Sequence, residues 1–387
     1  MKIIWKEEKD RYVQCATLNK IREDLRPQYF MITSDRNDGK SYAVKETALR
    51  DFWEKGLEFA YLRRYEIDIK REDQSLYWSD FSNGEKNLVK EITGGKWSEV
   101  IAPRGGKTFN LANPVEGQPG KYDIGPLCGR IHALSIAKSY KSMQYPAIGN
   151  IIFEEFVTDS GYLFNEPSRL FQYVSTIFRG RMGTVWLVGN NVSRLNPYFR
   201  EWQLVNALKM KPGDLDTYKE TYTDEDGKLS ETTVAMYWPD VEGKAGKKSM
   251  FFGNAAGMIQ GKRFDSREMT HLERPRNEYE VRYSVVMEIG AGLNFLMTLL
   301  QHRTERARVL WYVEPKTTEI QKGTRIIGAI PHEGRRWTRD FIPLTPREAK
   351  AFQYFKLGRV AYSDNLTGTE FQRALAQIRA TGSGTEG

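Results

Sequence analysis

The stretch from Tyr29 to Ser41 is YFMITSDRNDGKS, an apolar run followed by a glycine-lysine-serine loop. Val44, Ala48 and Phe52 follow at helical spacing and predict an amphipathic helix over 40–55. A strand, a loop and a helix in this order suit a phosphate-binding loop, because N–H groups of the turn and the helix N-terminus can cradle phosphates. In such a loop the lysine reaches the outer phosphates and the serine hydroxyl holds Mg²⁺. The predicted ATP-binding residues are Ser34, Asp35, Arg36, Asn37, Asp38, Gly39, Lys40 and Ser41.

The loop departs from its usual pattern in two ways. Ser34 stands where the first glycine is expected, and the acids Asp35 and Asp38 would repel a triphosphate. These departures leave open a non-hydrolysing DNA-binding scaffold with a degraded loop. A second glycine-lysine-threonine run, Gly105 to Thr108, is followed by FNLANP, which cannot continue as a helix, so we predict a β-turn there.

Composition narrows the class of protein. At 387 residues with 40% hydrophobic content, the chain is long enough for two packed domains. We expect a soluble, intracellular protein without a membrane partner, because no apolar run approaches the roughly 20 residues that span a bilayer. The only cysteines are Cys15 and Cys128, and the four histidines are dispersed, which argues against disulfides and zinc sites.

The net charge of +8 lies in the C-terminal third. Residues 247–387 carry 23 basic against 15 acidic side chains, whereas residues 1–246 carry 35 of each. This asymmetry fits a partner with a phosphate backbone, and it equally fits a solvated basic surface.

The order of predicted elements indicates an α/β protein. Apolar strands at 58–62, 148–153 and 184–188 alternate with helices, as in a parallel sheet, and the Gly/Pro-rich stretch 94–126 predicts a hairpin insertion. We expect a P-loop ATPase domain over 1–207, a linker or lid over 208–250, a C-terminal α+β domain over 251–380, and a disordered tail over 381–387.

Two carboxylates end the predicted strand 148–153. Glu154 suits a Mg²⁺ ligand and Glu155 suits the base that polarises the attacking water, although such a pair is otherwise a common start of a solvated loop. Because the pair follows a phosphate loop at a plausible distance, we predict a Walker B element with Glu155 as the catalytic base.

Three further sites have a functional and a structural interpretation. Arg179 ends a predicted helix and suits an arginine finger or a favourable C-terminal charge, and Asn190 suits a γ-phosphate sensor or a turn residue. Arg63 and Arg64 end the strand 58–62 between aromatics, where they would contact DNA phosphates or meet solvent.

Taken in order, these motifs resemble the DNA-encapsidation (packaging) ATPases of small podophages of the phi29 type, relatives of large terminases and double-stranded DNA translocases. The resemblance rests on eight stretches: Ser34–Ser41, Tyr42-Ala43, Tyr61–Tyr65, Tyr145-Pro146, Ile151–Phe156, Thr176–Arg179, Gly189-Asn190 and Asn196–Phe199. They span about 170 residues in one order.

The resemblance implies an ASCE-type ATPase that works as a homopentameric ring on the portal of an assembling procapsid in the host cytoplasm. It implies ATP and Mg²⁺ as cofactors, double-stranded DNA as partner, and a structural RNA as a further candidate partner. Lys40, Glu155 and a neighbour's Arg179 would be catalytic, Ser41 and Glu154 would hold the metal, and Asn190 and Lys141 would couple hydrolysis to motion. Arg63, with Arg64 beside it, would grip DNA.

The resemblance also implies a C-terminal RNase H-like domain that is a vestigial nuclease. Glu280, Glu288, Asp340 and Asp364 are scattered, whereas a two-metal nuclease needs clustered carboxylates. A basic, catalytically silent domain therefore fits better, and a terminase with an active nuclease stays the alternative.

Overall fold

A computed structural model describes most of the chain: residues 10–35, 37–70, 74–83, 86–103, 105–158, 162–163, 165–190, 196–223, 229–241, 278–288, 294–316, 320, 323–328 and 336–380. Arg36, residues 242–277 and the predicted tail 381–387 lie outside these ranges. The described residues fall into two compact units, one drawn from 1–158, 165–190 and 209–252, the other from 159–164, 191–208 and 253–387. The domain boundaries drawn from the sequence stay predictions.

The first unit is built on a nine-stranded sheet. Its strands, in spatial order, are β3 (Glu99–Ile101), β4 (Thr108–Pro114), β5 (Tyr122–Ala133), β2 (Glu58–Arg63), β6 (Ile148–Glu154), β7 (Thr184–Asn190), β1 (Tyr29–Ser34), β9 (Leu229–Tyr237) and β8 (Leu215–Thr223). The six strands from β5 to β9 run parallel, whereas β3–β4, β4–β5 and β8–β9 pair antiparallel. One strand, β7, separates the phosphate-loop strand β1 from the carboxylate-bearing strand β6. This additional strand is the mark of the ASCE class and confirms the predicted parallel-sheet ATPase fold.

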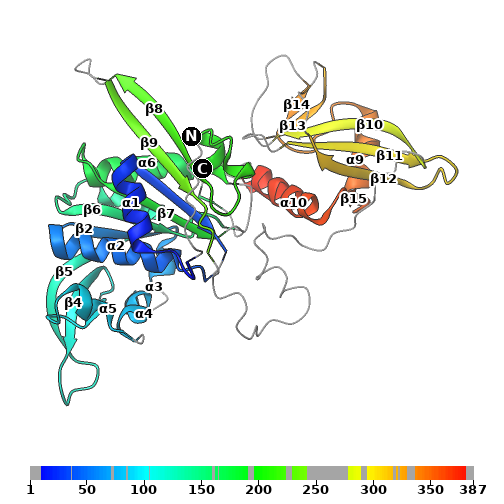
Figure 1. Cartoon of the computed structure of the whole chain (residues 1–387). Coiled ribbons are helices and arrows are strands. Elements are labelled where there is room, and N and C mark those ends of the chain that lie inside the picture. Colours follow the sequence, from blue (N-terminus) through cyan, green and yellow to red (C-terminus); the bar gives the residue numbers. More distant parts are fainter. Residues whose placement is uncertain are drawn as a thin grey trace. The chain divides into compact units, whose positions relative to one another are not determined.

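Helices cover both faces of this sheet (Figure 1). Leu18 of α1 (Cys15–Leu25) and Val44 of α2 (Lys40–Lys55) belong to the apolar cluster that includes Phe30. The neighbouring Tyr29 points the other way and meets Phe171 of α6 (Glu166–Phe178), with ring centroids 5.5 Å apart. Successive strand residues face opposite sides, so all six residues of β1 are buried.

The remaining elements of the first unit are short. They are α3 (Glu66–Lys70), η1 (Gln74–Trp78), α4 (Ser79–Ser82), α5 (Leu88–Ile92) and η2 (Leu134–Tyr140). α7 (Pro197–Glu201) follows β7 in the chain and belongs to the second unit, whereas η3 (Ala207–Lys209) crosses the boundary between the two units. Among the described helices, none has the length and apolar composition that crossing a bilayer requires.

α1 lies in the polar stretch before β1, and its buried residues Cys15, Leu18 and Ile21 pack it on α2. One segment differs from expectation. Where a linker or lid is expected at 208–250, the structure has the hairpin β8–β9, and β9 pairs with β1 from Tyr29↔Val234 to Ile32↔Tyr237 (Figure 1). This hairpin completes the sheet. The run Gly105 to Thr108 leads into β4, as the predicted turn requires.

The second unit contains a six-stranded sheet with the order β14-β13-β10-β11-β12-β15. The strands are β10 (Tyr279–Glu288), β11 (Asn294–His302), β12 (Val309–Pro315), β13 (Ile326–Gly328), β14 (Trp337–Thr338) and β15 (Val360–Tyr362). β10, β11 and β12 pair antiparallel, and β13 lies parallel to β10. Helices α9 (Pro346–Lys356) and α10 (Asn365–Ala380) contribute Phe352 and Phe371 to a core around Trp311. This order agrees with the RNase H-like fold that the resemblance implies.

Candidate active site

The phosphate loop joins the carboxyl end of β1 to the first turn of α2. Gly39 has φ +84°, and a Cβ there would lie 3.0 Å from Cβ of Tyr12, so conformation and space both favour glycine. Ser34 is still part of β1 and is not among the residues with positive φ. A serine is therefore tolerated at this position because the backbone there has a strand conformation that any residue adopts.

The ammonium group of Lys40 lies between two strands. Its Nζ donates to Oδ1 of Asn190 at 2.7 Å and to the carbonyl oxygen of Asp35 at 2.8 Å. Asn190 ends β7 directly beside Ser34 of β1 in the register of the sheet. The fold thus brings the predicted sensor amide to the predicted phosphate-binding lysine, 150 residues away in the chain.

Glu154 occupies the same end of the sheet. Its Oε2 accepts a hydrogen bond from Ser41 Oγ at 3.1 Å, and its Oε1 accepts one from the hydroxyl of Tyr77 at 2.9 Å. Burial raises the pKa of Glu154, and the two hydrogen bonds and the nearby charges of Lys45 and Lys40 oppose that rise. A hydroxyl and a carboxylate oxygen are the hard donors that Mg²⁺ prefers, so Ser41 and Glu154 fit the ion.

Glu155 and Arg63 form an ion pair beside this group. Glu155 follows the last residue of β6 with φ +57°, and its Oε2 accepts from Arg63 Nη2 at 3.1 Å. The side chain of Glu155 is 61% exposed, which leaves it accessible to solvent. Arg63, predicted to grip DNA, therefore contacts the predicted catalytic base.

Arg64 is buried, whereas a contact with DNA requires an accessible side chain. It is 5% exposed and pairs through two nitrogens with Glu166, at 2.8 and 3.0 Å. It also donates to the carbonyl oxygens of Glu155 and Phe156, at 3.0 and 3.1 Å. Arg64 ties the backbone of Glu155 and Phe156 to Glu166 in the first turn of α6, and its burial leaves the guanidinium little surface for a DNA phosphate.

Arg179 and Lys141 lie together, apart from Lys40 and Glu154. Arg179 caps the C-terminus of α6, is exposed, and donates from Nη2 to the carbonyl oxygens of Lys141 and Met143, at 3.2 and 2.9 Å. The neighbouring Arg181 donates to the carbonyl of Ile148, the first residue of β6. Glu154 is the last residue of that strand, so Arg179 lies near the amino end of β6 and Glu154 at its carboxyl end, and β6 itself is about 20 Å long.

A buried histidine secures the segment that carries Lys141. His132 Nδ1 lies 2.6 Å from the hydroxyl of Tyr173 on α6, and its ring stacks on Tyr140 of η2. Burial, together with the charge of Arg130, lowers the pKa of His132 to about 4. The imidazole is therefore neutral at pH 7.

Acidification should weaken the first unit through His132. The unfolded chain takes up this proton near pH 6.5 and the folded chain only near pH 4, so the contribution is complete above pH 6.5 and declines as pH falls through that window. The slope is at most about 1.4 kcal/mol per pH unit. We expect urea unfolding of His132→Phe to depend less on pH between 6.5 and 4 than that of wild type. Parallel pH profiles would contradict a neutral buried histidine.

The acids of the second unit serve structural contacts. Glu280 pairs with Arg282 and with Arg306, the latter at 2.7 Å, and Asp364 accepts from Thr367 N at 2.7 Å near the start of α10. Asp340 Oδ1 accepts from Phe341 N at 2.7 Å. Among the described residues, no three His, Cys, Asp or Glu side chains are grouped to hold a metal ion.

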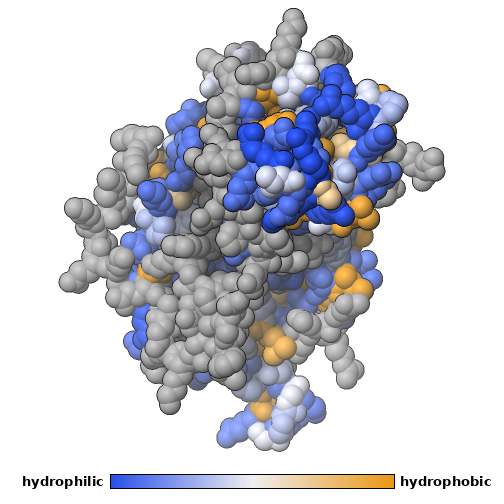
Figure 2. Space-filling model, turned by 90° about the vertical axis from the view of Figure 1, so that its right-hand side faces the viewer, coloured by the Kyte–Doolittle hydropathy of each residue, from blue (hydrophilic) through white to orange (hydrophobic). Residues whose placement is uncertain are grey.

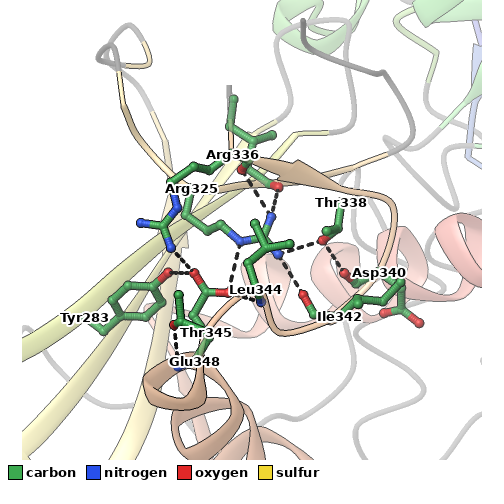
Figure 3. Close-up of polar contacts among 10 residues, drawn as sticks. Tyr283, Arg325, Arg336, Thr338, Asp340, Ile342, Leu344, Thr345 and Glu348 are labelled. Atoms are coloured by element: carbon green, nitrogen blue, oxygen red, sulfur yellow. Dashed lines mark hydrogen bonds and ion pairs between the residues drawn. The ribbon is translucent and has the colours of Figure 1, made fainter. Parts of the chain in front are cut away.

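The most densely bonded group of the second unit is centred on Glu348 (Figure 3). Glu348 is 1% exposed and accepts from Tyr283 OH at 2.6 Å, Leu344 N at 2.7 Å and Arg336 Nη2 at 2.5 Å. Arg325, 2% exposed, lies beside it with Nε 3.5 Å from Oε2. These contacts hold the start of α9 on β10 and β13. A view onto this unit shows mostly hydrophilic residues on the described part of its surface (Figure 2).

Sequence reasoning missed four residues that shape the site. Tyr77 and Lys45 contact or surround Glu154, Glu166 anchors Arg64, and His132 packs on α6. The adjacent aromatics Tyr77 and Trp78 were a usable signal for a packed segment, whereas the pairing of Glu166 with Arg64 spans 102 residues and leaves no local pattern.

Comparisons with known proteins agree with this geometry. The family model for the podovirus DNA encapsidation protein (Gp16) matches residues 117–221. A DNA packaging protein of Bacillus phage B103 is 31% identical over 180 residues, which are 46% of this chain and 48% of that protein. A DNA packaging protein of Bacillus phage phi29 is 27% identical over 247 residues, 60% of this chain and 64% of that protein. The matches thus cover less than two thirds of the length of either relative.

The fold comparison reaches further along the chain. A solved structure described as the bacteriophage Phi-29 viral genome packaging motor assembly superposes with a TM-score of 0.53 at 18% identity, covering 96% of this chain and 100% of that one. At this identity the likeness shows the fold alone. Together with the sequence matches, it confirms the resemblance of this chain to the DNA-encapsidation proteins of phi29-type podophages.

Proposed function

We propose that this chain is the Mg²⁺-dependent ATPase subunit of a ring motor that drives viral double-stranded DNA into a procapsid. One observation carries the proposal: Lys40, Ser41, Glu154 and Asn190 converge at the carboxyl ends of β1, β6 and β7 through contacts of 2.7 and 3.1 Å. The relatives named as DNA packaging proteins support the same conclusion.

The chemistry assigned to each residue follows from its position. Lys40 would bind the outer phosphates, Ser41 and Glu154 would hold Mg²⁺, and Glu155 would orient and deprotonate the attacking water. When bound, the ion would neutralise charge on the β- and γ-phosphate oxygens. Asn190, whose side chain accepts a hydrogen bond from Lys40, would register the loss of the γ-phosphate. Release of Glu155 from Arg63 would accompany assembly of the reactive geometry.

The proposal also includes the assembly in which the ATPase would work and its partners. A homomeric ring, most simply a pentamer, would dock on the portal of a procapsid in the host cytoplasm, with a structural RNA as a further candidate partner. The second unit would contact the nucleic-acid backbone without cleaving it, in keeping with the 23 basic and 15 acidic side chains of residues 247–387.

Hydrolysis of ATP by the full-length protein tests this proposal. We expect Mg²⁺-dependent turnover that double-stranded DNA stimulates, and no divalent-dependent cleavage of plasmid DNA in the same reactions. Plasmid cleavage would favour a terminase with an active nuclease. Absence of ATP turnover, even with portal and procapsid present, would favour a DNA-binding scaffold and overturn the proposal.

Mixed rings test the role of Arg179. Because Arg179 lies near the amino end of β6 and Glu154 at its carboxyl end, we expect Arg179 to act on a neighbour's nucleotide. Subunits with Arg179→Ala retain an intact phosphate loop, and subunits with Lys40→Ala retain the arginine. Mixing the two inactive variants should restore part of the DNA-stimulated ATPase activity. Zero activity at every mixing ratio would contradict action in trans.

A further inference from the structure

Tyr77 enters the site from a segment that none of the motifs includes. It belongs to η1, and its hydroxyl lies 2.9 Å from Oε1 of Glu154. The other carboxylate oxygen, Oε2, accepts from Ser41 at 3.1 Å. Each oxygen of Glu154 therefore has its own donor, which fixes the plane of the carboxylate as well as its position.

Tyr77 is itself held in place from several sides. Its ring lies 4.2 Å from that of Tyr61, centroid to centroid, and its carbonyl oxygen accepts from Lys45 Nζ at 2.7 Å. Lys45 is 3% exposed and donates also to Oδ1 of Asp80 at 2.6 Å. A carboxylate oxygen only accepts, so the hydroxyl of Tyr77 is the donor in its contact with Glu154.

These contacts connect α2, η1 and Glu154 in a closed ring. Ser41 and Lys45 are one turn apart on α2 and so share a face of the helix. Ser41 donates directly to Glu154. Lys45 donates to the backbone carbonyl of Tyr77, and the hydroxyl of Tyr77 donates to the same carboxylate. Helix α2 thus carries one donor to the carboxylate, Ser41, and fixes the other, Tyr77, through the hydrogen bond from Lys45.

The side chain of Glu154 is one methylene longer than that of an aspartate, which ends in the same carboxylate. The extra methylene gives the carboxylate more conformations, and each freely rotating bond weakens the hold on a metal ion. We propose that Tyr77 is a positioning residue that compensates for this length by orienting the carboxylate of Glu154, which together with Ser41 would hold Mg²⁺. The inference rests on the proposed ATPase function and adds a residue to it.

Titration of Mg²⁺ in the full-length protein tests Tyr77. With a fluorescent ATP analogue as probe, Tyr77→Phe should raise the half-saturating Mg²⁺ concentration about tenfold, as loss of a partner of a metal ligand typically does. Binding of the analogue without Mg²⁺ should match wild type, because Lys40 and the loop are untouched. The matched control is Tyr140→Phe, which removes a half-buried hydroxyl that accepts from Ala133 N at 3.0 Å, in the segment packed on α6. We expect the control to leave the Mg²⁺ titration unchanged.

A double-mutant cycle separates positioning from general packing. Glu154→Asp shortens the side chain, so the carboxylate cannot reach both donors and loses the contact with Tyr77. Tyr77→Phe should therefore have almost no further effect on the Mg²⁺ titration in the Glu154→Asp background. A structural role alone would give the same loss in both backgrounds.

The outcomes distinguish this inference from the function on which it rests. If wild type shows Mg²⁺-dependent analogue binding and Tyr77→Phe titrates like wild type, Tyr77 does not position Glu154. The inference is also overturned if Tyr77→Phe weakens Mg²⁺-free binding equally, because the residue then supports the fold. If wild type itself shows no Mg²⁺-dependent binding, the proposed function fails and the role of Tyr77 fails with it.

Discussion

Glu155→Gln should lower ATP turnover by about 10² to 10⁴, the usual contribution of a general base, while ATP binding survives. The glutamine cannot take a proton from water. Glu155 is the first residue after β6 and lies beyond the Lys40, Ser41 and Glu154 group, which keeps its contacts. The measurement is DNA-stimulated phosphate release, compared with binding of an ATP analogue to the same preparation.

The fold should tolerate this change. The amide oxygen of a glutamine can still accept the hydrogen bond from Arg63, and the carbonyl of residue 155 keeps its bond from Arg64. The control is Glu116→Gln, on the exposed turn between β4 and β5. It removes the same charge from a turn that carries none of the predicted site residues, and it should leave turnover unchanged. Turnover of Glu155→Gln within a few-fold of wild type would mean that another group activates the water.

Arg64→Met should destabilise the first unit by about 3–5 kcal/mol, because it removes the guanidinium that pairs with the fully buried carboxylate of Glu166. The same change removes the hydrogen bonds that Arg64 donates to the carbonyls of Glu155 and Phe156. Urea unfolding, followed by tryptophan fluorescence, measures the effect. The large cost reflects the 0% exposure of the Glu166 side chain rather than the number of bonds.

The adjacent arginine supplies the control for this prediction. Arg63 pairs with Glu155, whose side chain is 61% exposed, and such accessible pairs contribute about 1 kcal/mol or less. Arg63→Met should therefore cost far less stability than Arg64→Met. Replacing Arg64 and Glu166 together by methionine should recover part of the loss, since no charge is then left buried. Equal destabilisation by the two single arginine changes would refute the structural role of Arg64.

Local patterns predicted much of the fold. The apolar runs at 29–33, 58–62, 148–153 and 184–188 correspond to β1, β2, β6 and β7, because buried parallel strands consist of short continuous apolar stretches. The helix predicted over 40–55 corresponds to α2, because Val44, Ala48 and Phe52 follow the 3.6-residue periodicity of a helix. The strands β8 and β9 were not recognised within the expected linker or lid at 208–250, because the apolar signal of β9 is weak and its pairing with β1 joins residues 205 positions apart, such as Tyr29 and Val234.

Some residues of the candidate site can likewise be recognised from local sequence patterns, and others cannot. The loop from Ser34 to Ser41 and the pair Glu154 and Glu155 are visible as short motifs, because strand ends and helix starts carry local signals. Which of two adjacent arginines is buried is not visible, since Arg63 and Arg64 differ only in the face of the strand end from which they project. The role of Tyr77 is not visible in the sequence either, because it depends on a contact with Glu154, 77 residues away. Chemistry confined to one turn can thus be predicted from neighbours in the chain, whereas partners and burial depend on how distant segments pack.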